Sequence, residues 1–102
     1  LLDALEAANA LQDTLVVWGS PMAVADLHTS WNMPIVMVDG TGYFDTGRYL
    51  RWGTYEGGYT GSTGVSSNRL LVSICQAMGL ELDSFGNLQD PALMTGPLDG
   101  LT

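Results

Sequence analysis

Two short apolar runs dominate the first forty positions of the chain. Residues 14–18 read Thr-Leu-Val-Val-Trp and residues 34–38 read Pro-Ile-Val-Met-Val, and a glycine follows each run within two residues. Unbroken apolarity is typical of a strand that is buried on both faces, as in a parallel α/β sheet. Pro34 is compatible with this interpretation, because the first position of a strand tolerates a missing N–H group. We therefore predict two buried parallel strands in one sheet.

Helical periodicity flanks these strands. Residues 1–12 place leucine or alanine at positions 1, 5, 8 and 11, which is the spacing of an amphipathic helix. A second helix is predicted over residues 67–79, with Ser67 as its N-cap and Gly79 as its stop. We expect this helix to pack on the sheet through the apolar side chains of Leu70, Leu71, Ile74 and Met78, with Cys75 as a buried, inert thiol in the same stripe.

The connecting segments contain little periodicity. Residues 19–33 are predicted to form a loop, and residues 47–52 a short edge strand. Residues 53–64 form a glycine-rich loop with five glycines, and so long a loop in a compact region is usually functional, partner-bound or disordered. It is either a flexible linkage or an interaction loop with Trp52, Tyr55 and Tyr59 as aromatic anchors, since tryptophan and tyrosine are enriched at interface hot spots.

This order of elements provides only half of a sheet. Two buried strands with two helices need neighbouring strands, so we expect a piece of a larger α/β domain. The chain also opens inside an amphipathic pattern, at Leu1-Leu2-Asp3. Residues 1–102 show no internal repeat and no domain boundary, and they are therefore interpreted as a single fragment that is incomplete on its own.

The amino-acid composition indicates that another polypeptide covers part of the surface. Hydrophobic residues make up 46% of the chain and charged residues only 14%, whereas about 25% charged residues is typical. Another polypeptide, either the rest of the same precursor or a partner subunit, is therefore expected to cover part of the surface. Eleven acidic residues, three arginines and no lysine give a net charge of −8. This balance argues against nucleic acid and anionic membrane surfaces, which need clustered cations, and no apolar run approaches the roughly 18 residues that span a bilayer.

The combination of motifs resembles an uncharacterised family of large exported bacterial proteins. The resemblance lies in Thr-Leu-Val-Val-Trp-Gly-Ser at 14–20, His28, Met-Pro-Ile-Val-Met-Val-Asp-Gly at 33–40 and Gly-Arg-Tyr-Leu-Arg at 47–51, and it continues at 68–71, 76–80, 83–86 and 96–98. It covers nearly the whole chain and corresponds to the C-terminal end of that family. It implies export, to the periplasm or outside the cell.

That family is in turn distantly similar to the alkaline phosphatase and sulfatase superfamily. The resemblance implies the C-terminal portion of a three-layer sandwich with a mostly parallel sheet. In the superfamily a late strand ends in an Asp-His pair of metal ligands, and a further histidine precedes the next strand. Here the strand ends in Ser20-Pro21, and only His28 matches the later histidine. His28 is therefore a candidate metal ligand only if upstream residues complete the site.

Candidate chemistry within the chain is sparse. A catalytic zinc site needs at least three protein ligands, and a single histidine beside Asp26, with one cysteine, does not supply them. His28 is otherwise a loop histidine bonded to backbone, or a partner contact. Arg48 and Arg51 are expected to pair with local carboxylates such as Asp45 or Glu56, and could alternatively hold an anionic ligand or a partner carboxylate. No cofactor is implied, because the glycines fit neither a phosphate-binding loop nor a dinucleotide fingerprint.

Two functions remain open on this basis. The first is a non-catalytic structural or accessory module of an exported protein, which acts through protein–protein contacts at Trp52, Tyr55, Tyr59, Arg48 and Arg51. The second is the C-terminal part of a metal-dependent phospho- or sulfo-ester hydrolase that upstream residues complete. The missing ligand pair favours the first, and we predict neither a bound transition metal at His28 nor ester hydrolysis by this chain.

Overall fold

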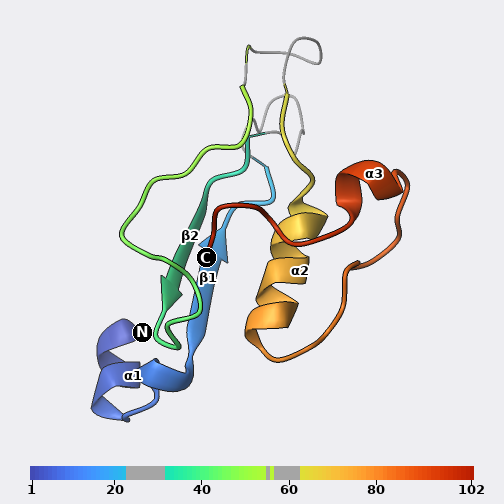
Figure 1. Cartoon of the computed structure of the whole chain (residues 1–102). Coiled ribbons are helices and arrows are strands. Elements are labelled where there is room, and N and C mark those ends of the chain that lie inside the picture. Colours follow the sequence, from blue (N-terminus) through green and yellow to red (C-terminus); the bar gives the residue numbers. More distant parts are fainter. Residues whose placement is uncertain (23–31, 55, 57–62) are drawn as a thin grey trace. The chain divides into compact units, whose positions relative to one another are not determined.

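The structure is a computed structural model, and it describes residues 1–22, 32–54, 56 and 63–102 (Figure 1). The chain divides into two compact units, Leu1–Arg48 and Tyr49–Thr102. The first unit contains the helix α1, a short 3-10 helix and the strands β1 and β2, whereas the second contains the helices α2 and α3.

The first unit begins with α1, Leu2–Ala7. The helix ends because Asn9 adopts a left-handed conformation with φ 53°. The N–H of Asn9 then donates to the carbonyl of Glu6 at 3.0 Å and that of Ala10 to the carbonyl of Leu5 at 2.9 Å, which is the Schellman pattern of a helix terminus. A 3-10 helix, Leu11–Asp13, leads from there into the first strand. The predicted helix over residues 1–12 is therefore shorter, and it is broken by a turn.

The two strands form an antiparallel ribbon. β1 spans Leu15–Gly19 and β2 spans Ile35–Asp39, and Val17 lies opposite Met37. Figure 1 shows the two arrows side by side and pointing in opposite directions. The prediction of a parallel sheet within a three-layer sandwich is thus wrong, because the described residues form a two-stranded antiparallel sheet and three short α-helices.

The error has a physical cause. Continuous apolarity indicates which side chains need cover, but it does not determine strand direction. A parallel pair requires a crossover, usually a helix, and residues 19–33 have no helical period. The strands themselves lie within one residue of the predicted positions. Residues 47–52, predicted as an edge strand, have no strand structure.

The turn after β2 is organised by one carboxylate. Asp39 Oδ1 accepts hydrogen bonds from the N–H and the hydroxyl of Thr41, at 2.8 and 2.6 Å, and Oδ2 accepts one from the N–H of Phe44 at 2.7 Å. Burial raises the pKa of this carboxyl. The hydrogen bonds from Phe44, Thr41 and the N–H of Tyr43 together lower it by more than burial raises it, so the pKa lies below its usual value. The turn directs Phe44 into the protein, where its side chain is buried.

The second unit is built on α2, Ser67–Ala77. Its N-cap is Ser66, one residue before the predicted one, and the Ser66 hydroxyl accepts a hydrogen bond from the N–H of Asn68. The predicted stop at Gly79 is confirmed. Gly79 has φ +84°, and the N–H of Leu80 donates to the carbonyl of Cys75 at 3.0 Å, so a Schellman motif ends this helix as well.

The buried face of α2 differs from the predicted one. Leu70, Val72 and Ser73 are buried, whereas Leu71 and Met78 are exposed. Only part of the predicted apolar stripe is therefore covered. The cover comes from the C-terminal segment that follows α3, Pro91–Met94, and that crosses α2 (Figure 1). Leu98 of this segment is buried.

Candidate interaction surface

The ribbon of β1 and β2 exposes large apolar side chains at one end. The exposed fractions are 73% for Trp18, 51% for Val36, 44% for Val17 and 38% for Ile35. Trp18 and Val36 are cross-strand partners and lie on one face, and Val17 and Ile35 lie on the other because side chains alternate along a strand. We call these four residues the apolar ribbon end.

The opposite end of the ribbon is better covered. Leu15 and Val16 in β1, and Met37 and Val38 in β2, are half-buried. The ribbon therefore changes from covered to exposed along its length, on both faces. A two-stranded sheet is marginally stable by itself, and burial of its apolar faces requires packing against another layer. At the apolar ribbon end the described residues provide little of that layer.

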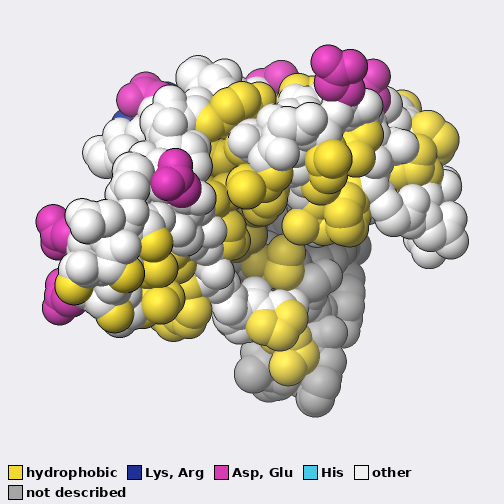
Figure 2. Space-filling model, turned by 90° about the horizontal axis from the view of Figure 1, so that it is seen from below, with side chains coloured by type: hydrophobic (Ala, Val, Ile, Leu, Met, Phe, Trp, Pro, Cys, Tyr) yellow, Lys and Arg dark blue, Asp and Glu magenta, His cyan; other side chains and the backbone are white. Residues whose placement is uncertain are grey.

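Exposed apolar side chains are common elsewhere on the described surface. Figure 2 shows a face on which hydrophobic side chains are widely visible, with acidic side chains among them and hardly any basic ones. The buried hydrophobic side chains of the described residues are Phe44, Leu70, Val72 and Leu98. Single exposed apolar residues are normal, but a contiguous group marks an interaction site. Trp18 gives the apolar ribbon end the residue type that most often anchors an interface.

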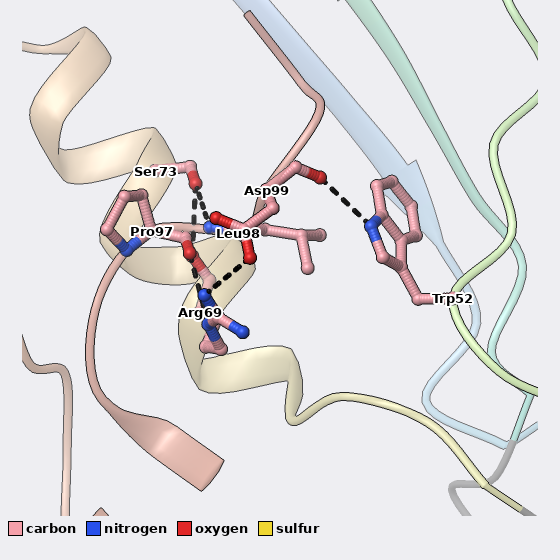
Figure 3. Close-up of polar contacts among 6 residues, drawn as sticks. All are labelled: Trp52, Arg69, Ser73, Pro97, Leu98 and Asp99. Carbon is pink, nitrogen blue, oxygen red and sulfur yellow. Dashed lines mark hydrogen bonds and ion pairs between the residues drawn. The ribbon is translucent and has the colours of Figure 1, made fainter. Parts of the chain in front are cut away.

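The polar contacts of the second unit join its C-terminal segment to α2. Figure 3 shows Arg69 of α2 between Pro97 and Asp99 of the C-terminal segment. Its Nε donates to the Pro97 carbonyl at 3.0 Å, and a terminal nitrogen lies 3.1 Å from Asp99 Oδ2. The Ser73 hydroxyl accepts a hydrogen bond from the N–H of Leu98 at 2.8 Å and donates to the Arg69 carbonyl at 3.1 Å. These contacts fasten the C-terminal segment to α2.

Trp52 also contacts the C-terminal segment. Its indole nitrogen donates a hydrogen bond of 3.0 Å to the backbone carbonyl of Asp99, and Figure 3 shows the ring directed toward that carbonyl. The side chain is half-buried. A bonded tryptophan of this kind stabilises its own unit, while a proposed role as an interface anchor would use only the part of the ring that remains exposed.

Arg48 and Arg51, the two arginines predicted to take part in contacts, lie in different surroundings. Arg48 pairs with Asp45, as the sequence predicts: the Arg48 Nε lies 3.1 Å from Asp45 Oδ2 and 2.9 Å from the Asp45 carbonyl. Arg51 is exposed. Arg48 belongs to the first unit, whereas Arg51 and Trp52 belong to the second.

Three other candidates lie outside the described residues, namely His28, Tyr55 and Tyr59. Within the part of the chain that the structure describes, no three His, Cys, Asp or Glu side chains gather as they would around a metal ion. The metal and the aromatic-loop hypotheses therefore stay predictions. Cys75, the free cysteine, is half-buried.

Comparisons with family models, with curated proteins and with solved structures find no match for this chain. The resemblance to the exported family and to the phosphatase and sulfatase superfamily accordingly stays a prediction. Among the described residues, none of the helices is long and apolar enough to cross a membrane.

Sequence reasoning missed the apolar ribbon end. The sequence pattern places Trp18 and Val36 inside a parallel sheet, and it places the aromatic anchors at Trp52, Tyr55 and Tyr59 in and next to the glycine-rich loop. A signal was nevertheless present, since the chain contains only two strongly apolar strand patterns. Two strands cannot cover both of their own faces, so some of these side chains had to remain exposed or meet another polypeptide.

Proposed function

We propose that this chain is a non-catalytic structural or accessory module of an exported protein, and that it acts through protein–protein contacts made by the apolar ribbon end. The observation that carries the proposal is the exposure of Trp18, Val36, Val17 and Ile35 together on a two-stranded ribbon. Export rests on the sequence resemblance alone.

The energetics favour a covered ribbon. Moving a large apolar side chain from water into a contact contributes about 1.5–3 kcal/mol. A tryptophan that is 73% exposed has most of this contribution still to gain. Interfaces concentrate their binding energy in a few such residues, surrounded by contacts that exclude water. The apolar ribbon end has that composition, with one aromatic side chain beside three aliphatic ones.

The polar groups of the described residues support the non-catalytic part. Both carboxylate oxygens of Asp39 accept hydrogen bonds from the turn that follows it. The Ser73 hydroxyl accepts a hydrogen bond from the N–H of Leu98, and Arg69 binds the C-terminal segment. Each of these groups has a structural role that accounts for its bonds. A nucleophile or general base, by contrast, would need a partner positioned for proton transfer.

Site-specific photocrosslinking tests the proposal. A photoreactive phenylalanine analogue replaces Trp18 in the protein as its native cell produces it, and Glu6, an exposed position on α1, carries the analogue in the matched control. We expect irradiation to give one discrete adduct with another polypeptide, or with a distant part of the same precursor, at position 18 and none at position 6. Equal labelling at both positions would contradict the proposal.

Catalysis is tested separately. We expect the purified protein to leave chromogenic phosphate and sulfate esters unchanged in the presence of zinc. Turnover that disappears in His28→Ala would overturn the non-catalytic part of the proposal and favour a hydrolase completed by upstream residues.

A further inference from the structure

The backbone of the ribbon has a defined set of outward hydrogen-bonding groups. The N–H of Gly40 donates to the carbonyl of Thr14 at 3.1 Å, and that of Ser20 to the carbonyl of Pro34 at 3.3 Å. These bonds flank the register in which residue 17 lies opposite residue 37. Because bonded and non-bonded pairs alternate in an antiparallel ladder, the even-numbered residues of β1 bond to β2. The N–H and C=O groups of Leu15, Val17 and Gly19 therefore point away from β2.

Nothing in β1 protects this edge. Natural edge strands usually carry charged residues, a proline or a bulge that prevents further pairing, but β1 reads Leu-Val-Val-Trp-Gly and pairs without a bulge. The outer edge of β2 differs, because Asp39 lies on it and ties its carboxylate to Thr41 and Phe44. No hydrogen bond from another described residue reaches the outward groups of Leu15, Val17 or Gly19. Within the described part of the first unit, β1 therefore has the edge that can accept a further strand.

Charge decides what kind of strand fits. The described residues of the first unit carry one arginine, paired with Asp45, against five acidic side chains: Asp3, Glu6, Asp13, Asp39 and Asp45. A second copy would bring the same negative charge to the edge, and like charges oppose association. A basic partner does not meet this repulsion, because opposite charges attract it to the first unit.

We propose that the outer edge of β1 pairs with an extended, apolar, lysine- or arginine-flanked segment of a different polypeptide, which adds a third strand to the ribbon. This inference rests on the proposed function and names the partner of the same surface. The backbone groups of Leu15, Val17 and Gly19 bond to the added strand, as in other cases of strand addition. Side chains of the added strand cover Trp18 on one face and Val17 on the other.

Three synthetic peptides test the proposal against the whole chain. The probe is an eight-residue peptide of alternating valine and threonine with a lysine at each end, the second peptide has glutamates at its ends, and the third is the lysine peptide with every backbone nitrogen N-methylated, so that neither of its edges has donors. We expect the lysine peptide to shift the amide resonances of residues 15, 17 and 19. The glutamate peptide should bind about tenfold more weakly or worse, and the N-methylated one should not bind, since it lacks the backbone donors.

A pair of proline variants separates the outer edge from the inner one. Val17→Pro removes an outward N–H and leaves the β1–β2 bonds in place, because proline is tolerated where the N–H of an edge strand faces solvent. It should keep the amide pattern of β2 and lose peptide binding. Val16→Pro removes an inward N–H and should disrupt the ribbon itself. If Val17→Pro also disrupts the ribbon, the N-methylated peptide still decides the question.

The outcomes distinguish this proposal from the previous one. Binding that survives N-methylation, shifts confined to other residues, no binding by the lysine peptide, or a dimer of the chain in sedimentation without peptide would each overturn the strand-addition proposal. The crosslink at position 18 is independent of these results, because it reports contact of a side chain and not pairing of a backbone edge.

Discussion

Asp39 is the residue whose loss should affect the first unit most directly. Asp39→Asn replaces Oδ2, which accepts from the N–H of Phe44, with an amide group that is itself a donor. The lost charge-assisted bond should lower the free energy of unfolding by about 1–2 kcal/mol. Chemical denaturation measures this change. Asp13→Asn, an exposed carboxylate next to β1, is the control and should have little effect.

The same carboxylate makes stability depend on pH. Its pKa is lower in the folded protein than the value of about 3.9 in an unfolded chain. Its contribution is therefore complete above that value and is lost as the pH falls through the lower, folded pKa. Denaturation curves between pH 6 and about pH 2 should show a steeper loss of stability below about pH 4 in the wild type than in Asp39→Asn. Identical curves would contradict this role.

Gly79 is the second residue with a specific prediction. Its φ of +84° lies in the region that side chains rarely adopt, although a Cβ there would meet no other atom. Gly79→Ala should therefore destabilise the protein through backbone strain alone, by about 1 kcal/mol. Gly64→Ala is the matched control, because its φ lies outside that region and its Cβ would only touch the Trp52 carbonyl, at 3.4 Å. Thermal unfolding of both variants checks the difference, and equal changes would count against the Schellman interpretation.

At the scale of elements, the fastening of the C-terminal segment to α2 depends on Ser73. Ser73→Ala leaves the N–H of Leu98 buried without its acceptor, which costs about 1–3 kcal/mol. We expect faster hydrogen exchange at the Leu98 amide and a matching loss of stability. Ser84→Ala, at an exposed position, should change neither. Unaltered exchange at Leu98 would show that Arg69 and Trp52 hold the segment without Ser73.

Much of the element pattern could be predicted from the sequence, and the architecture could not. Apolar runs locate β1 and β2 to within one residue, and Gly79 ends α2 where expected. These features depend on local chemistry, namely strand propensity and the conformational freedom of glycine. Strand direction depends on the connection and on neighbouring layers, and neither is encoded in residues 14–18 or 34–38.

The candidate surface was hidden for a related reason. An apolar strand residue gives the same sequence signal whether it is buried in its own fold or exposed for contact with a partner. The sequence pattern therefore places Trp18 in a core. The paired arginine, Arg48, was accessible to sequence reasoning because Asp45 lies three residues away. The bond from Trp52 to Asp99 joins residues 47 positions apart, and no local pattern indicates such a contact.

At the scale of the whole molecule, the low content of charged residues and the exposed apolar side chains both indicate a surface that favours association. Only 14% of the residues are charged, and exposed hydrophobic side chains occur in both units, among them Trp18 in the first and Met78 in the second. A surface of this kind favours association, while a net charge of −8 opposes association between copies. The two together favour a partner that is different from the chain itself.

The most direct test of the central claim is the accessibility of position 36 in the cell, since Val36 lies opposite Trp18 and is 51% exposed. Val36→Cys in a Cys75→Ala background leaves Trp18 in place, and Glu6→Cys in the same background is the exposed control. A small maleimide then labels both variants in intact cells and after purification. We predict that position 36 reacts about as fast as position 6 in the purified protein and about tenfold or more slowly in cells, because a partner covers the ribbon there. Equal reaction rates at the two positions in cells would contradict the account.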